Sequence, residues 1–231
     1  MMVITPIITI DGPSGVGKSA LCKNIGRLLK WNILNSGDIY RTLALFYSNH
    51  NIDILKSEKS LFQKLSNFDI KFFHEKNKIK VLLNSIDVTD KIREEKISKI
   101  SSIIAESPII RNFLLEKQRC FVKKPGLVAD GRDMGTVVFP YAPLKIFLNS
   151  SLEERTRRRK LQLKKIGFNV KFEFLLNEMK KRDERDYNRK ISPLLPASDA
   201  LIINSEKISL NQVTEKILQH VQEKLFNNFI Q

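Results

Sequence analysis

Ile7-Ile8-Thr9-Ile10-Asp11-Gly12-Pro13-Ser14-Gly15-Val16-Gly17-Lys18-Ser19 is the segment of this chain that says most about its fold. The part from Gly12 to Ser19 has the spacing GxxxxGKS of a phosphate-binding P-loop. The apolar run before it, Ile7–Ile10, predicts a buried strand, and residues 20–29 after it predict a helix. Because a P-loop requires a strand, a glycine loop and a helix in this order, the segment predicts binding of a nucleoside triphosphate.

The residue types of the loop suit the chemistry of phosphate binding. Glycines let backbone N–H groups point at phosphate oxygens, and the N-terminus of the following helix adds roughly half a positive charge. Lys18 can reach the β- and γ-phosphates, and the hydroxyl of Ser19 can ligate Mg²⁺. We expect ATP to contact the whole loop, namely Gly12, Pro13, Ser14, Gly15, Val16, Gly17, Lys18 and Ser19.

The composition of the 231 residues is that of a globular protein, with 42% hydrophobic and 28% charged residues. No apolar run approaches the roughly 18 residues of a membrane span, and the N-terminus does not resemble a signal peptide. Cys22 and Cys120 lie far apart, without the spacing of metal ligands. We therefore expect a cytoplasmic protein with no membrane partner.

The net charge of +15 allows three interpretations. It could attract nucleic acid, attract a small polyanionic substrate, or reflect many lysines on a solvated surface. Residues 151–190 hold 14 Lys and Arg against seven Asp and Glu, a local balance of +7. Many of these cations are arginines, which suit bidentate phosphate contacts better than lysines do.

The rest of the chain predicts an α/β fold with a doubly wound, five-stranded parallel sheet. Further short apolar runs at 126–129, 144–148 and 200–203 are expected to be strands of this sheet. Residues 151–182 are expected to be helical, with a break near Gly167. A closing amphipathic helix is expected over 209–226, with Leu210, Val213, Ile217, Val221 and Leu225 on one face.

Residues 66–90 depart from this pattern. They alternate in polarity around a polar turn, which predicts an antiparallel hairpin or a three-strand meander. We expect an inserted subdomain at 60–106, with 1–59 and 107–231 forming the P-loop core. A short helical lid is expected at about 151–190 within that core.

Polar residues beside the predicted strands are candidates for the site. Ligands of an open α/β sheet bind outside the carboxyl ends of the strands, so Asp130 could hold Mg²⁺ through water and Arg132 could pair with a phosphate. Ser36 is a natural helix N-cap, and Arg41 lies about one turn further on. Taken alone, Ser36 and Arg41 are better explained as a simple helix cap and a surface arginine than as a second anion site.

Two charged helical segments leave their role open. Arg155, Arg158 and Arg159 share one face of the helix that begins near Glu153, and this face is either a phosphate clamp or a solvated surface. In Arg182-Asp183-Glu184-Arg185-Asp186-Tyr187-Asn188-Arg189, three side chains form one stripe: Arg182, Asp186 and Arg189. They are either surface ion pairs or a polar wall facing a ligand.

Four motifs together resemble the bacterial cytidylate kinase family from about residue 4 to about 225. They are Ile-Asp-Gly-Pro-Ser-Gly-x-Gly-Lys at 10–18, Ser-Gly-x-x-Tyr-Arg at 36–41, Ala-Asp-Gly-Arg-Asp-Met-Gly-Thr at 129–136 and the charged segment at 182–189. The β-rich insertion also resembles the enlarged monophosphate-binding domain of that family. One departure is Ser19-Ala20, where relatives often have Gly-Thr or Ser-Thr, but Ser19 keeps a hydroxyl for Mg²⁺.

The resemblance implies transfer of the γ-phosphoryl group of ATP to CMP or dCMP. We expect the protein to be a monomer that needs Mg²⁺ and binds no nucleic acid. The resemblance also implies that Ser36, Arg41, Asp130 and Arg132 bind the monophosphate or its surroundings. Ser102, Arg111 and Arg189 would contact cytosine, and Arg182 and Asp186 the sugar. Lys18, Arg132 and the lid residues Arg155 and Arg158 would be catalytic. Asp133 would be an acceptor or a water-mediated metal ligand.

Two other kinds of function remain compatible with the residues themselves. One is a P-loop kinase for another small molecule, such as UMP, AMP or shikimate. The other is a nucleic-acid-binding P-loop ATPase, for which the net charge is the one supporting feature.

Overall fold

The computed structural model describes residues 5–49, 65, 67–75, 78–165 and 167–226. The chain divides into two compact units, one of residues 1–35 and 117–231 and one of residues 36–116. The second unit contains the predicted insertion 60–106, but its edges coincide with the ends of secondary-structure elements near residues 35 and 117. We describe each unit by itself.

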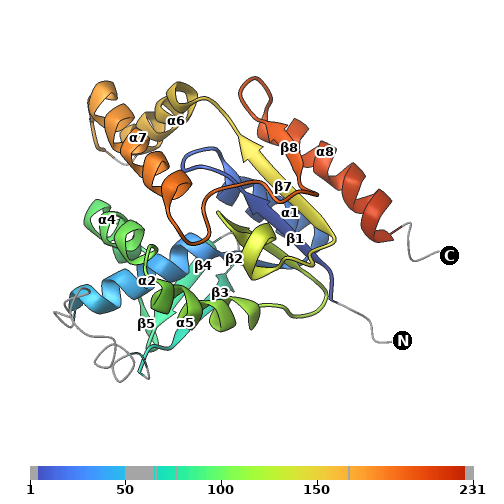
Figure 1. Ribbon diagram of the computed structural model, residues 1–231, viewed down its shortest axis with the longest axis horizontal. Coiled ribbons are helices and arrows are strands. Elements are labelled where there is room, and N and C mark those ends of the chain that lie inside the picture. The colour runs from blue at the N-terminus through green and yellow to red at the C-terminus, as the bar shows by residue number, and fades with distance from the viewer. Residues whose placement is uncertain (1–4, 50–64, 66, 76–77, 166, 227–231) are drawn as a thin grey trace. The chain divides into compact units, whose positions relative to one another are not determined.

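A five-stranded parallel sheet forms the first unit, as predicted (Figure 1). Its order is β2-β6-β1-β7-β8, and every neighbouring pair runs parallel. The strands are β1 (Ile7–Asp11), β2 (Asn32–Asn35), β6 (Leu127–Gly131), β7 (Leu144–Asn149) and β8 (Leu201–Asn204). Since β1 lies between β6 and β7, the P-loop begins at the middle of the sheet, where the strand order reverses.

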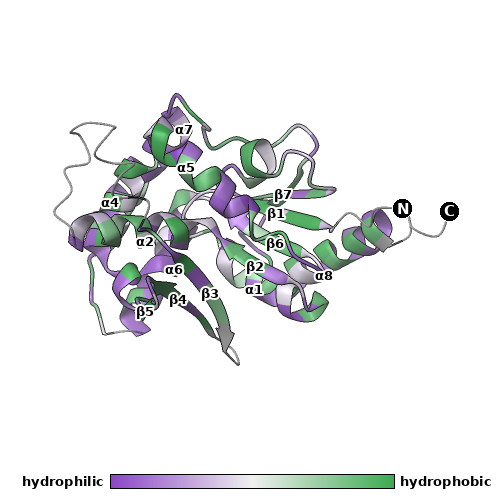
Figure 2. Cartoon of the chain, turned by 90° about the horizontal axis from the view of Figure 1, so that it is seen from below, coloured by the Kyte–Doolittle hydropathy of each residue, from purple (hydrophilic) through white to green (hydrophobic). Residues whose placement is uncertain are grey.

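Burial explains why the central strands are almost continuously apolar. In β1, Ile8 and Ile10 are fully buried, and the strand is drawn largely in the hydrophobic colour (Figure 2). Helices cover strands of a parallel sheet on their faces, so the alternation typical of a half-exposed strand is lost. Strand β8 lies at the edge, and there Ile202 is 60% exposed while Ile203 is buried.

Helices α1 (Lys18–Leu29) and α8 (Leu210–Val221) pack together, and Asn24 Nδ2 donates to Thr214 Oγ1 at 2.9 Å. A capping box at Ser209 and Gln212 begins α8. The predicted apolar face is buried at Val213, Ile217 and Val221 of α8, and at Leu225 of the π-helical turn Gln222–Phe226 that follows it. Leu210 is 42% exposed, because the first helical residue lies beyond the edge of the core.

Helices α6 (Leu152–Lys165) and α7 (Phe172–Asn188) replace the predicted broken helix at 151–182. The break occurs at Gly167, whose φ of +88° is a left-handed conformation that glycine adopts without strain. Helix α7 runs further than expected, to Asn188, and Arg189 follows it in an extended conformation. Arg189 therefore does not belong to the helical stripe predicted for it.

The second unit has a three-stranded antiparallel sheet in the order β3-β4-β5, as predicted for 66–90. Its strands are β3 (Ile70–Glu75), β4 (Lys78–Leu83) and β5 (Ile86–Asp87), and its helices are α2 (Ser36–Asn49), α4 (Glu95–Ile104) and α5 (Pro108–Arg119). A 3₁₀ helix, Lys91–Arg93, precedes α4. Phe68 lies in this core against Phe46 and Phe113, with ring centroids 5.7 Å and 6.1 Å away.

Gly12 offers a test of how closely the P-loop packs on the sheet. Its φ is +145°, and a Cβ atom there would lie 2.1 Å from the carbonyl oxygen of Leu148 in β7. Because backbone cannot move aside cheaply, we expect Gly12→Ala to destabilise the protein by at least about 2 kcal/mol. Gly167→Ala is the matched control, since it has a positive φ but no atom within 4 Å. Equal urea midpoints for the two variants would contradict this packing.

Candidate active site

The P-loop lies between β1 and α1, as predicted. Gly17 adopts a left-handed conformation with φ of +105° and caps α1, so the helix begins at Lys18. Lys18 Nζ donates to the carbonyl oxygens of Gly12 and Pro13, both at 2.7 Å. The side chain thus folds back over its own loop, where its ammonium can also meet an anion held by that loop.

The buried position of Lys18 shifts its proton equilibrium. Burial, together with the nearby charge of Arg132, lowers the pKa of Lys18 to about 7, against the opposing effect of Asp130 and Asp11. A bound polyphosphate would supply negative charge and favour the ammonium form. The site is therefore arranged to gain most from Lys18 when phosphate is present.

Ser19, Asn35 and Asp130 come together beside the loop from three different elements. Ser19 Oγ donates to Asp130 Oδ2 at 2.7 Å, and Asn35 Nδ2 donates to Ser19 Oγ at 2.9 Å. Asp130 was expected just after a strand, but β6 continues through Gly131 and Asp130 is one of its last residues. Its carboxylate still lies at the carboxyl end of the sheet, next to the P-loop serine.

A hydroxyl and a carboxylate are hard oxygen ligands, the kind that Mg²⁺ prefers. Ser19 and Asp130 therefore fit the predicted ion by the chemistry of their donor atoms, with Asn35 holding the serine. Among the residues that the structure describes, no group of three or more His, Cys, Asp or Glu side chains could enclose a metal ion by itself.

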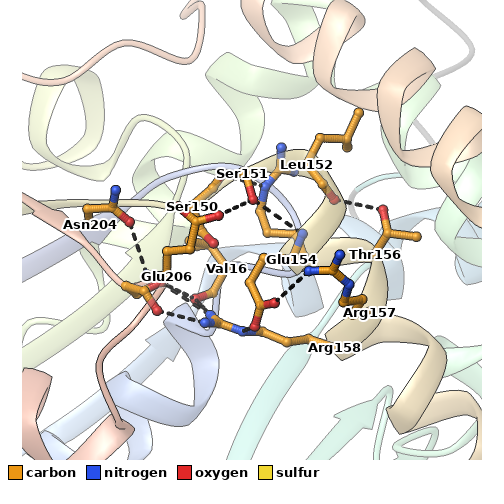
Figure 3. A network of polar contacts seen from close by, with 12 residues as sticks. Val16, Ser150, Ser151, Leu152, Glu154, Thr156, Arg157, Arg158, Asn204 and Glu206 are labelled. Carbon is orange, nitrogen blue, oxygen red and sulfur yellow. Dashed lines mark hydrogen bonds and ion pairs between the residues drawn. The ribbon is translucent and has the colours of Figure 1, made fainter.

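Both arginines predicted for the lid contact backbone carbonyls of the P-loop. Arg155 Nη1 donates to the carbonyl of Ser14 at 3.1 Å, and Arg158 Nη1 to that of Val16 at 3.3 Å. Figure 3 shows Arg158 also reaching Glu154, and its Nη2 donates to the Ser205 carbonyl at 2.6 Å. Arg155 is buried and pairs with Asp183 of α7 at 2.7 Å, so this face is not merely solvated.

Helix α7 contributes a second pair, of which Asp186 is buried and Arg132 is partly exposed. Asp186 accepts a short hydrogen bond from Arg132 Nε, and Arg189 Nη1 lies 4.0 Å from the other carboxylate oxygen. Burial alone would raise the pKa of Asp186, but Arg132, Arg182 and Arg189 outweigh it and hold that pKa below its usual value. These charged residues are therefore not surface ion pairs. They form a largely buried network that joins α7 to the loop after β6.

Sequence reasoning missed Asp11, the last residue of β1. Its two carboxylate oxygens accept backbone N–H groups from Met134 at 2.9 Å and Gly135 at 2.7 Å. A Cβ atom on Gly135 would lie 3.3 Å from Asp11 Oδ2 and 2.9 Å from Thr9 Oγ1. Asp11 thereby fixes the loop that carries Arg132 and Asp133; the one signal in the sequence was an acid between an apolar strand and Gly12.

Asp11 leads to a prediction about pH. Burial raises its pKa from 3.8 to about 7, against the opposing effect of the two N–H donors. An acid whose pKa is higher in the folded state stabilises that state at low pH and loses the contribution as pH rises from about 4 to 7. We therefore expect the stability of wild type relative to Asp11→Asn to fall over this range in urea unfolding. A difference that grows with pH would contradict this assignment.

The predicted residues of the second unit lie on α2, α4 and α5. Ser36 is the buried first residue of α2, and Arg41 Nη2 contacts Asp38 Oδ1 at 2.5 Å. Arg111 is buried on α5, where Nη1 donates to the Ala105 carbonyl at 3.0 Å and the guanidinium lies 5.9 Å from the centre of the Tyr40 ring. Ser102 is half-buried on α4, while its neighbour Ser101 is buried with Oγ bonded to the Ser98 carbonyl. The proposed roles of these residues stay predictions.

No helix of the described residues is long and apolar enough to cross a membrane.

In comparisons with known proteins, residues 8–223 match the model of the cytidylate kinase family. The chain is 51% identical over 225 residues to "Cytidylate kinase" of Salmonella choleraesuis (strain SC-B67), and 50% identical to that of Salmonella paratyphi A (strain ATCC 9150 / SARB42). Each alignment covers 97% of this chain and 99% of the relative.

Among solved structures, TT1252 from Thermus thermophilus is 15% identical, with a TM-score of 0.48 over 96% of this chain and 98% of that one. The identity of the curated relatives extends over almost the entire chain, both compact units included. The family model likewise begins in β1 and ends beyond α8. This chain therefore belongs to the cytidylate kinase family.

Proposed function

We propose that this protein transfers the γ-phosphoryl group of ATP to CMP or dCMP, giving CDP or dCDP and ADP. The observation that carries the proposal is a complete P-loop, with Ser19 hydrogen-bonded to Asp130, in a chain about half identical over its length to proteins named cytidylate kinase. The expectations of a cytoplasmic monomer with no nucleic-acid partner stay predictions.

The ATP half of the proposal rests on the first unit. Backbone N–H groups of residues 12–19 would hold the phosphates, and Lys18 would leave the carbonyls of Gly12 and Pro13 to meet the β- and γ-oxygens. Ser19 and Asp130 would hold Mg²⁺, which neutralises charge on the phosphate oxygens when it is bound. Arg155 and Arg158, already at the P-loop carbonyls, would be close to the charge that develops during transfer.

The monophosphate half is proposed from the family. Ser36, Arg41 and Arg132 would bind its phosphate, and Arg182 and Asp186 its sugar. Ser102, Arg111 and Arg189 would read cytosine by donating to its N3 and O2 acceptors. Phosphoryl transfer needs in-line placement and neutralised charge more than covalent help, so we assign no strong general base. Closure of the proposed lid at about 151–190 would exclude water that could otherwise take the phosphoryl group.

The test is a coupled assay of ADP formation with CMP, dCMP, UMP and AMP at fixed ATP and Mg²⁺. Uracil carries a hydrogen on N3, so donors aimed at N3 would lose their acceptor, and an unpaired buried donor costs about 1–3 kcal/mol. We expect kcat/KM for UMP to be roughly 5- to 150-fold below that for CMP, with AMP lower still. Equal use of UMP and CMP would contradict the cytosine-reading residues. A preference for AMP would contradict the proposed function.

A further inference from the structure

One carboxylate in the second unit bridges two arginines. Asp38, in the first turn of α2, contacts Arg41 Nη2 at 2.5 Å through Oδ1. Arg93, at the end of the 3₁₀ helix, forms a two-pronged pair with the same group, Nη1 to Oδ1 and Nη2 to Oδ2, both at 2.6 Å. The sequence motif at 36–41 pointed to Ser36 and Arg41, and neither Asp38 nor Arg93 was singled out.

The burial of the three side chains shows which one is the anchor. The Asp38 side chain is 4% exposed, whereas those of Arg41 and Arg93 are 16% and 45% exposed. The backbone of Asp38 is held as well, since Thr42 Oγ1 donates to its carbonyl at 2.8 Å. A buried, fixed anion therefore holds two more exposed cations in one place.

The charge and donor count leave this cluster able to bind an anion. Two guanidiniums and one carboxylate sum to one positive charge. Each guanidinium has five N–H donors, and Asp38 engages two of those of Arg93. Without Asp38 the two cations would repel each other, and the more exposed Arg93 would regain side-chain freedom that a ligand would have to remove on binding. Two guanidiniums held together match the oxygens of a phosphate dianion.

We infer that Asp38 is a positioning residue that holds Arg41 and Arg93 as a pre-organised clamp for the phosphate of the monophosphate substrate. The inference rests on the proposed function, and what it adds to that function is the positioning role of Asp38. Asp38 acts through the two arginines and does not itself contact the substrate, because its carboxylate and the phosphate are both anions and repel each other.

The experiment compares Asp38→Asn with wild type and with Asp69→Asn, an exposed acid of the same unit that pairs with Lys71. Asparagine keeps the shape of aspartate, but it has no charge and only one of its two polar atoms, the amide oxygen, can accept hydrogen bonds from the guanidiniums. We expect Asp38→Asn to raise KM for CMP at least ~10-fold with little change in KM for ATP. In titration calorimetry, the same substitution should raise Kd for CMP at least ~10-fold. It should leave unchanged the Kd for cytidine, a weaker ligand that has no phosphate.

Other outcomes separate this inference from the proposed function. Loss of CMP and cytidine binding alike would mean a general structural role, and an unchanged KM for CMP would also overturn the inference. If Asp38→Asn does not fold, Arg93→Ala replaces it, because the Arg93 side chain is 45% exposed and its removal is better tolerated. The same loss of affinity for CMP but not for cytidine is then expected. If wild type itself does not phosphorylate CMP, the proposed function fails first.

Discussion

Replacing Lys18 by alanine is expected to lower kcat at least ~100-fold, since one positioned charge aimed at the transition state contributes several kcal/mol. The fold should persist. Within the part of the chain that the structure describes, the hydrogen bonds of the ammonium go to the carbonyls of Gly12 and Pro13. Burial already disfavours its charged form, which lowers its pKa to about 7. The measurement is the rate of ADP formation with CMP at saturating ATP, together with thermal unfolding.

Lys23→Ala is the matched control for that experiment. Lys23 is an exposed lysine further along the same helix, so its replacement changes the net charge by the same amount. We expect it to keep wild-type turnover. Near-normal turnover in Lys18→Ala with an intact fold would contradict the assignment of the P-loop to catalysis.

Replacing Asp186 by alanine is expected to destabilise the protein by about 3 kcal/mol at pH 7, because it leaves the mostly buried Arg132, whose side chain is 17% exposed, without this carboxylate. It should also lower kcat/KM for CMP, since Arg132 and Asp186 are both proposed to bind substrate. The folded-state pKa of Asp186 lies below its usual value. Its contribution to stability is therefore present above about pH 4 and is lost as pH falls further.

Urea unfolding at pH 7 and near pH 3 checks this, with Asp199→Asn as the control. Asp199 also pairs with a cation, Lys145 at 3.0 Å, but its side chain is 59% exposed. An exposed pair contributes less than about 1 kcal/mol, so the control should change little at either pH. An unfolding free energy of Asp186→Ala equal to that of wild type would contradict a buried ion pair.

Local pattern was sufficient for much of this fold. The P-loop, the parallel strands and the three-strand meander are all signalled by short runs of apolar and glycine residues, and the structure confirms them. Boundaries were less certain, because hydrogen bonding to neighbours extends a strand beyond its apolar run. Strand β6 thus reaches Gly131 and includes Asp130.

Contacts between distant parts of the chain could not be read in the same way. Asp11 meets Met134 and Gly135, and Arg155 meets Asp183, only because the fold brings separate elements together. The same holds for Asp38 and Arg93, which lie 55 positions apart. A sequence shows the charge of such residues but not the partner, and here the partner decides whether an arginine is solvated or structural.

The most direct test of the proposed function follows the transferred group itself. Wild-type protein is incubated with ATP labelled at the γ-phosphate, Mg²⁺ and CMP, and the products are separated. We predict that the label appears in CDP. Without CMP, ATP should keep its label, and Lys18→Ala should prevent the transfer of label even when CMP is present. Label released as inorganic phosphate, whether without CMP or in response to added nucleic acid, would contradict a cytidylate kinase and favour an ATPase.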